Sequence, residues 1–314
     1  MQESSLRDVM PGDLRTQEPL ARHTTIRIGG PARLFAAPEG EAALGRALAW
    51  AAAQGLDWRV LGLGSNLLCP DAGFDGLVLS LEAACAWVRF TGPVVEVGAG
   101  VHLAPLVAAA ATRGLSGLEG VAGIPGTVGG ALAMNAGTAA GDIGAVVRSV
   151  RAMTPSGEVL DVPAAEMGFG YRQSRLQRER LLALGAVLEL RPADAAAVRQ
   201  ELRLRAARRR QTQPLELPNS GSIWRNPPGD FAGRLVEAAG CRGWRRGDAQ
   251  VSPRHANFIV NLGRARASDV LSLMADVRAA VRAAYEWTLE PELCWLPGRE
   301  DLLRLLGAGE GAAR

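Results

Sequence analysis

Apolar residues recur along this chain in two periods, and the period of each segment predicts its secondary structure. Residues 41–54, EAALGRALAWAAAQ, are alanine-rich with apolar side chains at helical spacing, and residues 102–113 share that spacing. Both segments are predicted helices. Three later segments are predicted helices on the same grounds: 194–210, 232–239 and 268–288.

Shorter runs rich in valine, leucine and aromatic residues are predicted strands, because Gly, Pro or Asp separates each run from the next. These runs are 58–63, 76–81, 86–90, 94–99, 146–153, 158–162, 181–190, 258–262 and 292–297. Residues 1–20 show neither period, and we expect them to form a flexible leader. The order of elements indicates an α+β protein with a domain boundary near residues 192–215.

Two glycine-rich segments interrupt this pattern. The first, GLGSN at 62–66, directly follows a predicted strand, and the second is GIPGTVGGALAMNAG at 123–137. Glycine permits positive φ and removes side chains, so successive backbone amides can converge on an anion, and a helix N-terminus in the second segment would suit a phosphate. Taken alone, a glycine-rich segment of this kind is more often an ordinary tight turn. Together they indicate a large phosphate-bearing cofactor, although neither matches a Rossmann or Walker loop.

Composition narrows the possible chemistry. The chain has 314 residues, 48% of them apolar, which suits a two-domain globular protein. All 35 basic residues are arginines, set against 32 carboxylates, so Schiff-base and Walker-type chemistry, which need a lysine amine, are excluded. The net charge of +3 gives no indication of nucleic acid binding.

The sequence also indicates where the protein is located and whether it holds a metal. The polar N-terminus lacks an apolar signal core, and the apolar run at 103–111 is too short to span a membrane. Four scattered cysteines without CxxC spacing argue against a zinc site or a disulfide framework, and fit a reducing compartment. We therefore expect a cytoplasmic protein without membrane insertion and without a metal site.

Six motifs fall in order along residues 20–300 and together resemble one family. They are HTTIRIGGPA (23–32), LGLGSNLL (61–68), GLEGVAGIPGTVGGALAMNAG (117–137), FGYRQS (169–174), QPLELPNSGSIWRNPPGDFAGRLVEAAG (213–240) and VSPRHANFIVN (251–261). The family is UDP-N-acetylenolpyruvoylglucosamine reductase, the flavoenzyme of peptidoglycan precursor synthesis. The short stretch between the fourth and fifth motifs resembles the compact form of that family, which lacks an extra substrate-capping loop.

The resemblance implies a fold, a reaction and ligands. The expected domains are a vanillyl-alcohol-oxidase-type FAD-binding lobe at 21–192 and a C-terminal α/β substrate-binding domain at 205–300, with a tail at 301–314. The implied reaction reduces the enolpyruvyl ether of a UDP-sugar with NADPH through non-covalent FAD. Residues implied to bind the cofactor lie at the first motif and the two glycine-rich segments: Gly29, Gly62, Gly64, Ser65, Asn66, Gly123, Gly126, Thr127 and Gly129. The resemblance implies no oligomeric state.

Three residues match the family's catalytic positions. Arg172 would pair with the substrate carboxylate and its developing enediolate, Ser222 would donate the proton, and Glu292 would assist as an acid or hydrogen-bond donor. A basic residue usually follows two positions after that glutamate in the family, where this chain has a cysteine. Substrate contacts are expected from four further residues: Tyr171, Arg209, Arg225 and Asn226.

Alternatives remain at this point. Ser220 and Glu290 compete with Ser222 and Glu292 for the two roles, and the surrounding motif register favours the latter pair. Another FAD-dependent oxidoreductase of the same fold is possible, but such enzymes lack the NSGSIWRNPPG segment. A non-catalytic sugar-nucleotide binding protein would tolerate the loss of Arg172, Ser222 or Glu292, yet all three are present.

Overall fold

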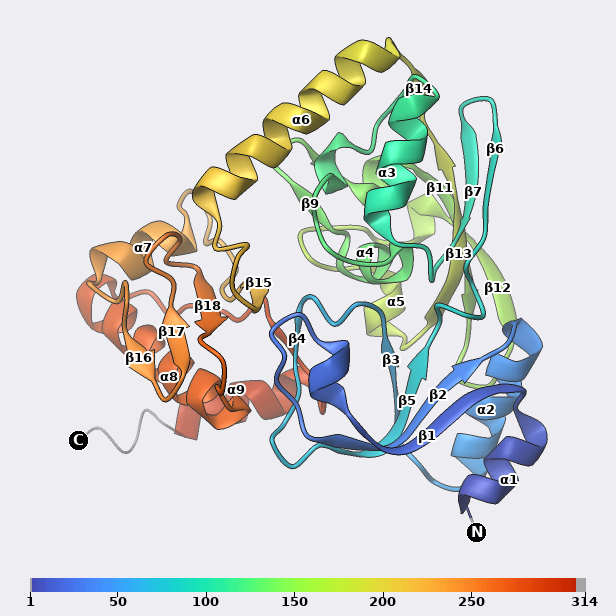
Figure 1. The fold of residues 1–314 in the computed structure, drawn as a ribbon, viewed down its shortest axis with the longest axis horizontal. Coiled ribbons are helices and arrows are strands. Elements are labelled where there is room, and N and C mark those ends of the chain that lie inside the picture. The colour runs from blue at the N-terminus through green and yellow to red at the C-terminus, as the bar shows by residue number, and fades with distance from the viewer. Residues whose placement is uncertain (1, 309–314) are drawn as a thin grey trace. The chain divides into compact units, whose positions relative to one another are not determined.

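A computed structural model describes residues 2–308 and divides the chain into two compact units (Figure 1). Unit 1 consists of the residues up to Thr16 together with Leu34–Leu63 and Asp75–Arg209. Unit 2 consists of Gln17–Arg33, Gly64–Phe74 and the residues from Arg210 on. Each unit has its own hydrophobic core, and the two cores share no residue.

Unit 1 contains most of two sheets. The five-stranded sheet is antiparallel throughout and runs in the order β12 (Val159–Pro163), β11 (Val147–Met153), β13 (Leu182–Glu189), β7 (Val94–Gly98), β6 (Val88–Thr91). The four-stranded sheet runs β1 (Gly12–Pro19), β2 (Pro31–Pro38), β5 (Phe74–Ser80), β3 (Trp58–Leu61), and its β3–β5 pair is parallel. Short two-residue strands complete the set: β8 (Leu115–Ser116), β9 (Gly137–Thr138), β10 (Gly141–Asp142) and β14 (Arg191–Pro192).

The helices of unit 1 owe their packing to alanine and leucine on one side. Helix α2 (Glu41–Ala53) buries Ala43, Leu44, Ala47 and Leu48, and α3 buries Leu103 in the same core. Helix α4 packs against β13 and β7 of the five-stranded sheet. The other helices and turns with residues in this unit are α1 (Gln2–Val9), α3 (Leu103–Thr112), α4 (Val128–Met134), α5 (Arg175–Arg178), most of α6 (Ala195–Thr212), η2 (Glu119–Val121), η3 (Ile143–Val146) and η4 (Ala164–Glu166).

Unit 2 is a four-stranded antiparallel sheet covered by helices. The strand order is β15 (Asn219–Ser222), β18 (Phe258–Asn261), β17 (Ala249–Val251), β16 (Arg245–Arg246). Helix α8 (Ala267–Tyr285) packs against β16 and β17, and at its start the Arg266 amide donates to the Asp269 carboxylate at 2.9 Å. The remaining elements are η1 (Leu20–His23), α7 (Ala232–Ala238), α9 (Arg299–Ala308), and the parallel pair β4 (Leu67–Leu68) and β19 (Cys294–Trp295).

The five predicted helices are confirmed within two or three residues at each end, and the nine predicted strands all coincide with observed ones. The expected flexible leader at 1–20 is wrong. Residues 2–9 form α1, and β1 adds an edge strand to the four-stranded sheet. The cause is burial of three widely spaced apolar side chains, Leu6, Met10 and Leu14, in the core of unit 1.

The end of the chain differs from expectation in the same way. Residues 301–308 of the expected tail belong to α9 (Arg299–Ala308), which buries Leu302 and Leu306 in the core of unit 2. Residues 309–314 lie outside the part that the structure describes.

The expected continuous FAD-binding domain at 21–192 is not one unit by its contacts, since 17–33 and 64–74 belong to unit 2. Long-range hydrogen bonds explain why these two segments belong to unit 2. The Thr25 hydroxyl donates to the Asn219 carbonyl at 2.7 Å, and the Asp71 carboxylate accepts from the Ala267 amide at 2.7 Å.

Candidate functional site

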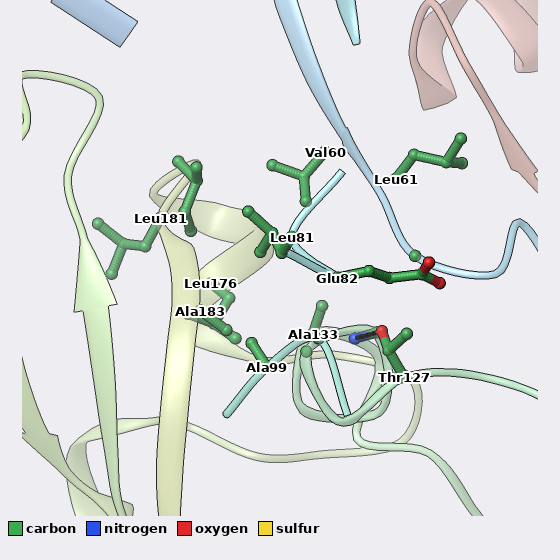
Figure 2. A pocket seen from close by; sticks show the side chains of 15 residues that line it. Val60, Leu61, Leu81, Glu82, Ala99, Thr127, Ala133, Leu176, Leu181 and Ala183 are labelled. Carbon is green, nitrogen blue, oxygen red and sulfur yellow. Dashed lines mark hydrogen bonds between the residues drawn. The ribbon is translucent and has the colours of Figure 1, made fainter. Parts of the chain in front are cut away.

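A cavity of about 130 Å³ lies inside unit 1, and its wall is made largely of glycine, alanine and leucine (Figure 2). Gly62, at the end of β3, lines one side of it, and Thr127, Gly129 and Gly130, at the start of α4, line another. A Cβ atom on Gly62 would lie 2.6 Å from Thr127 Oγ1. The fold therefore brings part of the first predicted glycine-rich segment into contact with the second.

Several amides at the start of α4, within the second glycine-rich segment, are bonded inside the protein. The amides of Val128 and Gly129 donate to the carbonyls of Val101 and Ala99, both at 2.8 Å. The Thr127 hydroxyl accepts from Gly130 at 3.3 Å, and the Thr127 carbonyl accepts from the Ala131 amide at 2.9 Å. Three of the four amides that a helix start leaves unpaired, those of Val128, Gly129 and Gly130, are thus used inside the protein.

The glycines of this cavity instead permit close packing. A Cβ on Gly129 would lie 3.0 Å from the Ala99 Cβ, so only glycine lets the helix approach the strand end this closely. Glu82 and Thr127 are the polar side chains labelled at the cavity in Figure 2. Glu82 is paired with His102, whose Nε2 lies 3.0 Å from the carboxylate. The cavity accordingly offers a smooth, mainly apolar wall.

Arg209 supplies a cation to the second glycine-rich segment. Its guanidinium lies against Gly123, where a Cβ would come within 3.0 Å of Nη1, and Gly123 has a φ of 76°. Burial lowers the pKa of Arg209 from its usual value, although an arginine remains charged at neutral pH. Gly126 contributes its carbonyl, which accepts from the Leu103 amide at 2.9 Å. The structure therefore places Arg209, expected at the substrate, beside residues expected at the cofactor.

Arg172 lies in a tight turn of unit 1. Gly170 and Gln173 exchange two backbone hydrogen bonds of 3.2 Å, and Arg172 between them has a φ of 57°. Its Nη2 donates to the Gly137 carbonyl at 3.2 Å, and its guanidinium lies 5.0 Å from the ring centre of Tyr171. Residues other than glycine, asparagine and aspartate rarely adopt this left-handed backbone conformation. The contacts around Arg172 must therefore stabilise it.

Ser222 and Glu292 are brought together in unit 2. Ser222 ends β15, and the carbonyl of the next residue, Ile223, accepts from the Glu292 amide at 2.8 Å. The pairing continues with an antiparallel bridge between Trp224 and Pro291. Two residues that the sequence separates by a long distance thus lie on directly paired backbone segments.

The remainder of the first glycine-rich segment joins this pair. The Asn66 side chain donates to the Glu292 carbonyl at 3.1 Å, and its own carbonyl accepts from the Cys294 amide at 3.0 Å. A Cβ on Gly221 would lie 4.0 Å from the Ser65 carbonyl oxygen. The predicted cofactor residues Gly64, Ser65 and Asn66 therefore lie beside the predicted catalytic ones.

Two glycines and one asparagine among the predicted site residues have local structural roles in unit 2. A Cβ on Gly29 would lie 2.7 Å from the Cys69 Cβ, and one on Gly64 would lie 2.2 Å from the His23 carbonyl oxygen. The Asn226 side-chain oxygen accepts from the Ala232 amide at 3.1 Å, which fixes the start of α7.

The cysteine that replaces the family's basic residue is uncharged. Burial raises the pKa of Cys294 to about 11, even though Arg225 and Arg299 counteract the shift. Arg299, which sequence reasoning did not single out, donates to the Pro291 carbonyl at 3.0 Å and to the Glu290 carboxylate at 3.1 Å. Glu290, the competitor of Glu292, is therefore engaged in an ion pair.

A search of residues 2–308 finds no group of three or more His, Cys, Asp or Glu side chains placed to hold a metal ion. Over the same residues, no helix is long and apolar enough to cross a membrane.

Comparisons with known proteins agree with this geometry. Residues 32–163 match the model of the FAD binding domain, and residues 213–296 match that of the UDP-N-acetylenolpyruvoylglucosamine reductase C-terminal domain. The chain is 47% identical over 290 residues to UDP-N-acetylenolpyruvoylglucosamine reductase 2 of Symbiobacterium thermophilum, covering 92% of this chain and 94% of that protein. It is 45% identical to the Heliobacterium modesticaldum reductase, over 90% of each chain.

Solved structures give the same result. The crystal structure of UDP-N-acetylenolpyruvylglucosamine reductase from Thermus caldophilus superposes with a TM-score of 0.78 at 37% identity, covering 92% of this chain and all of that one. A glucose dehydrogenase, Phl p 4.0202, superposes with a TM-score of 0.50 at 18% identity over 62% of this chain, which is a likeness of fold alone. The expected α+β fold, with a vanillyl-alcohol-oxidase-type FAD-binding lobe and a C-terminal substrate-binding domain, is confirmed.

Proposed function

Since the chain belongs to the UDP-N-acetylenolpyruvoylglucosamine reductase family, we propose that it reduces the enolpyruvyl ether of UDP-N-acetylglucosamine to UDP-N-acetylmuramate, with FAD as cofactor and NADPH as electron donor. The reaction belongs to peptidoglycan precursor synthesis, and we propose that it takes place in the cytoplasm. The observation that carries the proposal is the backbone pairing of the Ser222 and Glu292 segments in unit 2.

The residues of unit 1 fit a flavin dinucleotide. The cavity lined by Gly62, Gly129 and Ala99 gives a flat apolar ring a surface without obstructing side chains. The Arg209 guanidinium beside Gly123 supplies the positive charge that a diphosphate requires. Among the residues that line the cavity there is no histidine or cysteine to form a covalent bond, so we propose that FAD is held non-covalently.

FAD, when bound, supplies the hydride chemistry, and the protein supplies binding, orientation and a proton. Hydride addition to the enolpyruvyl double bond leaves negative charge on the carbon next to the carboxylate. Arg172, a fixed planar cation, pairs with that carboxylate and with the charge that develops on it. The turn that holds Arg172 at a φ of 57° pre-organises it for this role.

Ser222 donates the proton that completes the addition. A hydroxyl is a weak acid, but the carbanion is a strong base, so the driving force is sufficient. Gly221, with a φ of 76°, allows β15 to bend directly before Ser222. Glu292 assists the same step as an acid or hydrogen-bond donor from the paired segment. We propose that Tyr171, Arg225 and Asn226 contact the UDP-sugar.

Stopped-flow spectroscopy of Ser222→Ala tests the proposal. The wild-type protein should be yellow, lose its flavin absorbance on addition of NADPH, and regain it on addition of the enolpyruvyl substrate. We expect the variant to be reduced by NADPH normally and then to reoxidise about 10²–10⁴-fold more slowly, as for the loss of a general acid.

Ser220→Ala is the matched control, because its hydroxyl is buried and is without a hydrogen-bond partner in the described residues. It should reoxidise at the wild-type rate. A Ser222→Ala protein that reoxidised as fast as wild type would refute the proton-donor assignment. A wild-type protein that bound FAD but failed to reduce the enolpyruvyl substrate would refute the reaction.

A further inference from the structure

Asn135 ends helix α4 and is almost completely buried. Its side chain is 4% exposed, and its backbone has a left-handed conformation with φ 42° and ψ 57°. Asparagine is common at this position of a helix end, where the backbone amide alone completes the cap. Here that amide donates to the carbonyls of Ala131 and Leu132. The side-chain amide group takes no part in the cap and is available for another role.

Both polar atoms of the Asn135 side chain form hydrogen bonds with residues outside α4. Its Nδ2 donates to the Gly170 carbonyl at 3.1 Å, and its Oδ1 accepts from the Gly144 amide at 3.0 Å. Gly170 begins the turn that contains Arg172, and Gly144 lies in η3. Phe169 and Gly144 are closely packed, since a Cβ on Gly144 would lie 2.9 Å from the Phe169 ring. The asparagine thus connects three segments of unit 1.

The end of α4 holds the Arg172 turn at three points. Asn135 binds its first residue, Gly170, and the buried Ser174 hydroxyl at its far end donates to the Ala133 carbonyl at 2.8 Å. In between, Arg172 itself donates to the Gly137 carbonyl. The residues that make these three bonds from the α4 side are Ala133, Asn135 and Gly137, which lie within five consecutive positions. The orientation of Arg172 is therefore fixed by the C-terminal end of the helix whose N-terminal end lines the cavity.

We infer that Asn135 is a positioning residue for Arg172. The inference rests on the proposed role of Arg172 at the substrate carboxylate. A left-handed arginine backbone is unfavourable by itself, so the bond from Asn135 to Gly170 holds a turn that would otherwise relax. Displacing a charged group by about 1 Å can cost about 10²-fold in rate, so a small relaxation would affect catalysis. The same asparagine links the cavity wall to the substrate-binding cation.

Asn135→Asp isolates this bond. Aspartate keeps the acceptor for Gly144 and tolerates the left-handed backbone, but an ionised carboxylate cannot donate to the Gly170 carbonyl. We expect kcat/KM for the enolpyruvyl substrate to fall about 10- to 100-fold, while FAD retention and the rate of reduction by NADPH stay within about twofold. Asn135→Gly, which keeps the backbone conformation and removes both side-chain bonds, should show the same loss.

A pH profile separates positioning from general damage. The introduced carboxyl group is buried and faces a carbonyl oxygen, so its pKa should be raised, and its protonated form can donate to Gly170. The deficit of Asn135→Asp relative to wild type should therefore shrink as the pH is lowered from about 8 to about 6. Asn135→Gly should show no such recovery. An equal deficit for Asn135→Asp at every pH would contradict the inference.

A double-mutant cycle tests whether Asn135 acts through Arg172. Adding Asn135→Asp to Arg172→Ala should cause no further loss of kcat/KM, because the group being positioned is already absent. Losses that multiply in the double variant would overturn the inference. Asn261→Asp is the matched control: Asn261 is a buried asparagine of unit 2 whose Nδ2 donates to the Ile26 carbonyl at 3.0 Å. It should lower the Tm and leave kcat/KM within about twofold.

Limited trypsin digestion gives a readout that does not depend on activity. Cleavage after Arg172 requires the turn to open, so Asn135→Asp should accelerate it at least about tenfold, as for the loss of about 1.4 kcal/mol of local stability. Cleavage after Arg199, an exposed residue of α6, should not change. Unchanged cleavage after Arg172 would overturn the positioning role even if the wild-type protein reduces its substrate. Accelerated cleavage in a protein without that activity would refute only the proposed reaction.

Discussion

The residues around α4 in unit 1 and the paired segments of Ser222 and Glu292 in unit 2 are held by different means. Around α4, glycines pack so closely that Gly62 has no room for a Cβ beside Thr127, and the amides of Val128, Gly129 and Gly130 are bonded inside the protein. Around Ser222, short strands and the Glu292 segment are held by backbone hydrogen bonds. In the first region close packing determines the shape of a cavity, whereas in the second backbone pairing aligns segments that are distant in the sequence.

The difference corrects a common interpretation of glycine-rich sequence. A segment such as GIPGTVGG suggests amides aimed at a phosphate, but the amides of Val128 and Gly129 are already bonded to Val101 and Ala99. We propose that the positive charge for a diphosphate comes from a side chain on another helix, Arg209 of α6, which lies against Gly123. In this protein, glycine density marks close backbone packing.

The largest expected effect is a loss of catalytic rate, caused by a substitution in unit 2 that leaves the cofactor bound. Glu292→Ala should lower kcat about 10²–10⁴-fold, as for the loss of an acid or hydrogen-bond donor in the transition state, while the protein stays yellow. Rapid-reaction kinetics with NADPH and the enolpyruvyl substrate measure this. Glu290→Ala is the control, because that carboxylate pairs with Arg299 and is largely exposed, and it should retain near wild-type kcat. The reverse ranking of the two variants would show that the register of the glutamates is wrong.

The second effect concerns the core of unit 1. Leu14→Ala should lower the free energy of unfolding by about 2–5 kcal/mol, because Leu14 is 3% exposed within that core. Thermal denaturation followed by circular dichroism measures the change. Val9→Ala, at a side chain that is 37% exposed, should shift stability far less. Equal effects would mean that the N-terminal segment does not belong to the core.

The third effect is a loss of cofactor affinity caused by one added methyl group. Gly62→Ala places a Cβ 2.6 Å from Thr127 Oγ1, an overpacking that we expect to cost about 1–3 kcal/mol. The FAD dissociation constant should rise about 5- to 150-fold, which fluorescence titration of the apoprotein measures.

Gly45→Ala provides the contrast within the same unit. A Cβ there would meet only Met153, at 3.8 Å, in the middle of α2, so stability should rise by about 0.5–1 kcal/mol. If both variants bound FAD like wild type, close packing of glycine would not be what shapes the cavity.

The smallest expected effect concerns the four cysteines, whose thiols should be unreactive in the native protein. Burial raises the pKa of Cys69 and Cys85 to about 12 and that of Cys241 and Cys294 to about 11. At neutral pH the thiolate fraction is therefore about 10⁻⁴ or less, and the native protein should react with a thiol reagent only as fast as it unfolds. Four equivalents should appear in denaturant. Fast labelling of Cys294 in the native state would show that the Glu292 segment is more open than the structure indicates.

Much of the fold follows from local sequence. Alanine-rich amphipathic spacing is enough to place α2 and α3, since the signal lies within each helix. Helix α1 was missed because a polar sequence, QESSLRDV, has Leu6 as its main core residue, and its burial depends on contact with α2. Local pattern cannot show a partner that lies some 40 residues further along the chain.

The site shows the same limit. The family resemblance implied that Ser222 and Glu292 act in one reaction, and the structure pairs the backbone segments on which they lie. The role of Asn135 depends on Gly170, and that of Arg299 depends on Pro291 and Glu290, contacts that no spacing rule predicts. An asparagine at a predicted helix end is a weak signal, because the cap alone accounts for it.

The interleaved make-up of the two units has a consequence for the synthesis of the chain. Residues 17–33 and 64–74 belong to unit 2, but the rest of that unit begins only at Arg210. At a translation rate of about 5–20 residues per second, the second early piece waits roughly 7–27 s for its partners to begin to emerge. During that interval Ile26, Ile28 and Leu68 lack the apolar neighbours that later bury them. The nascent polypeptide thus exposes apolar side chains that are prone to aggregation. How long they stay exposed depends on how quickly the ribosome synthesises the C-terminal third, which buries them.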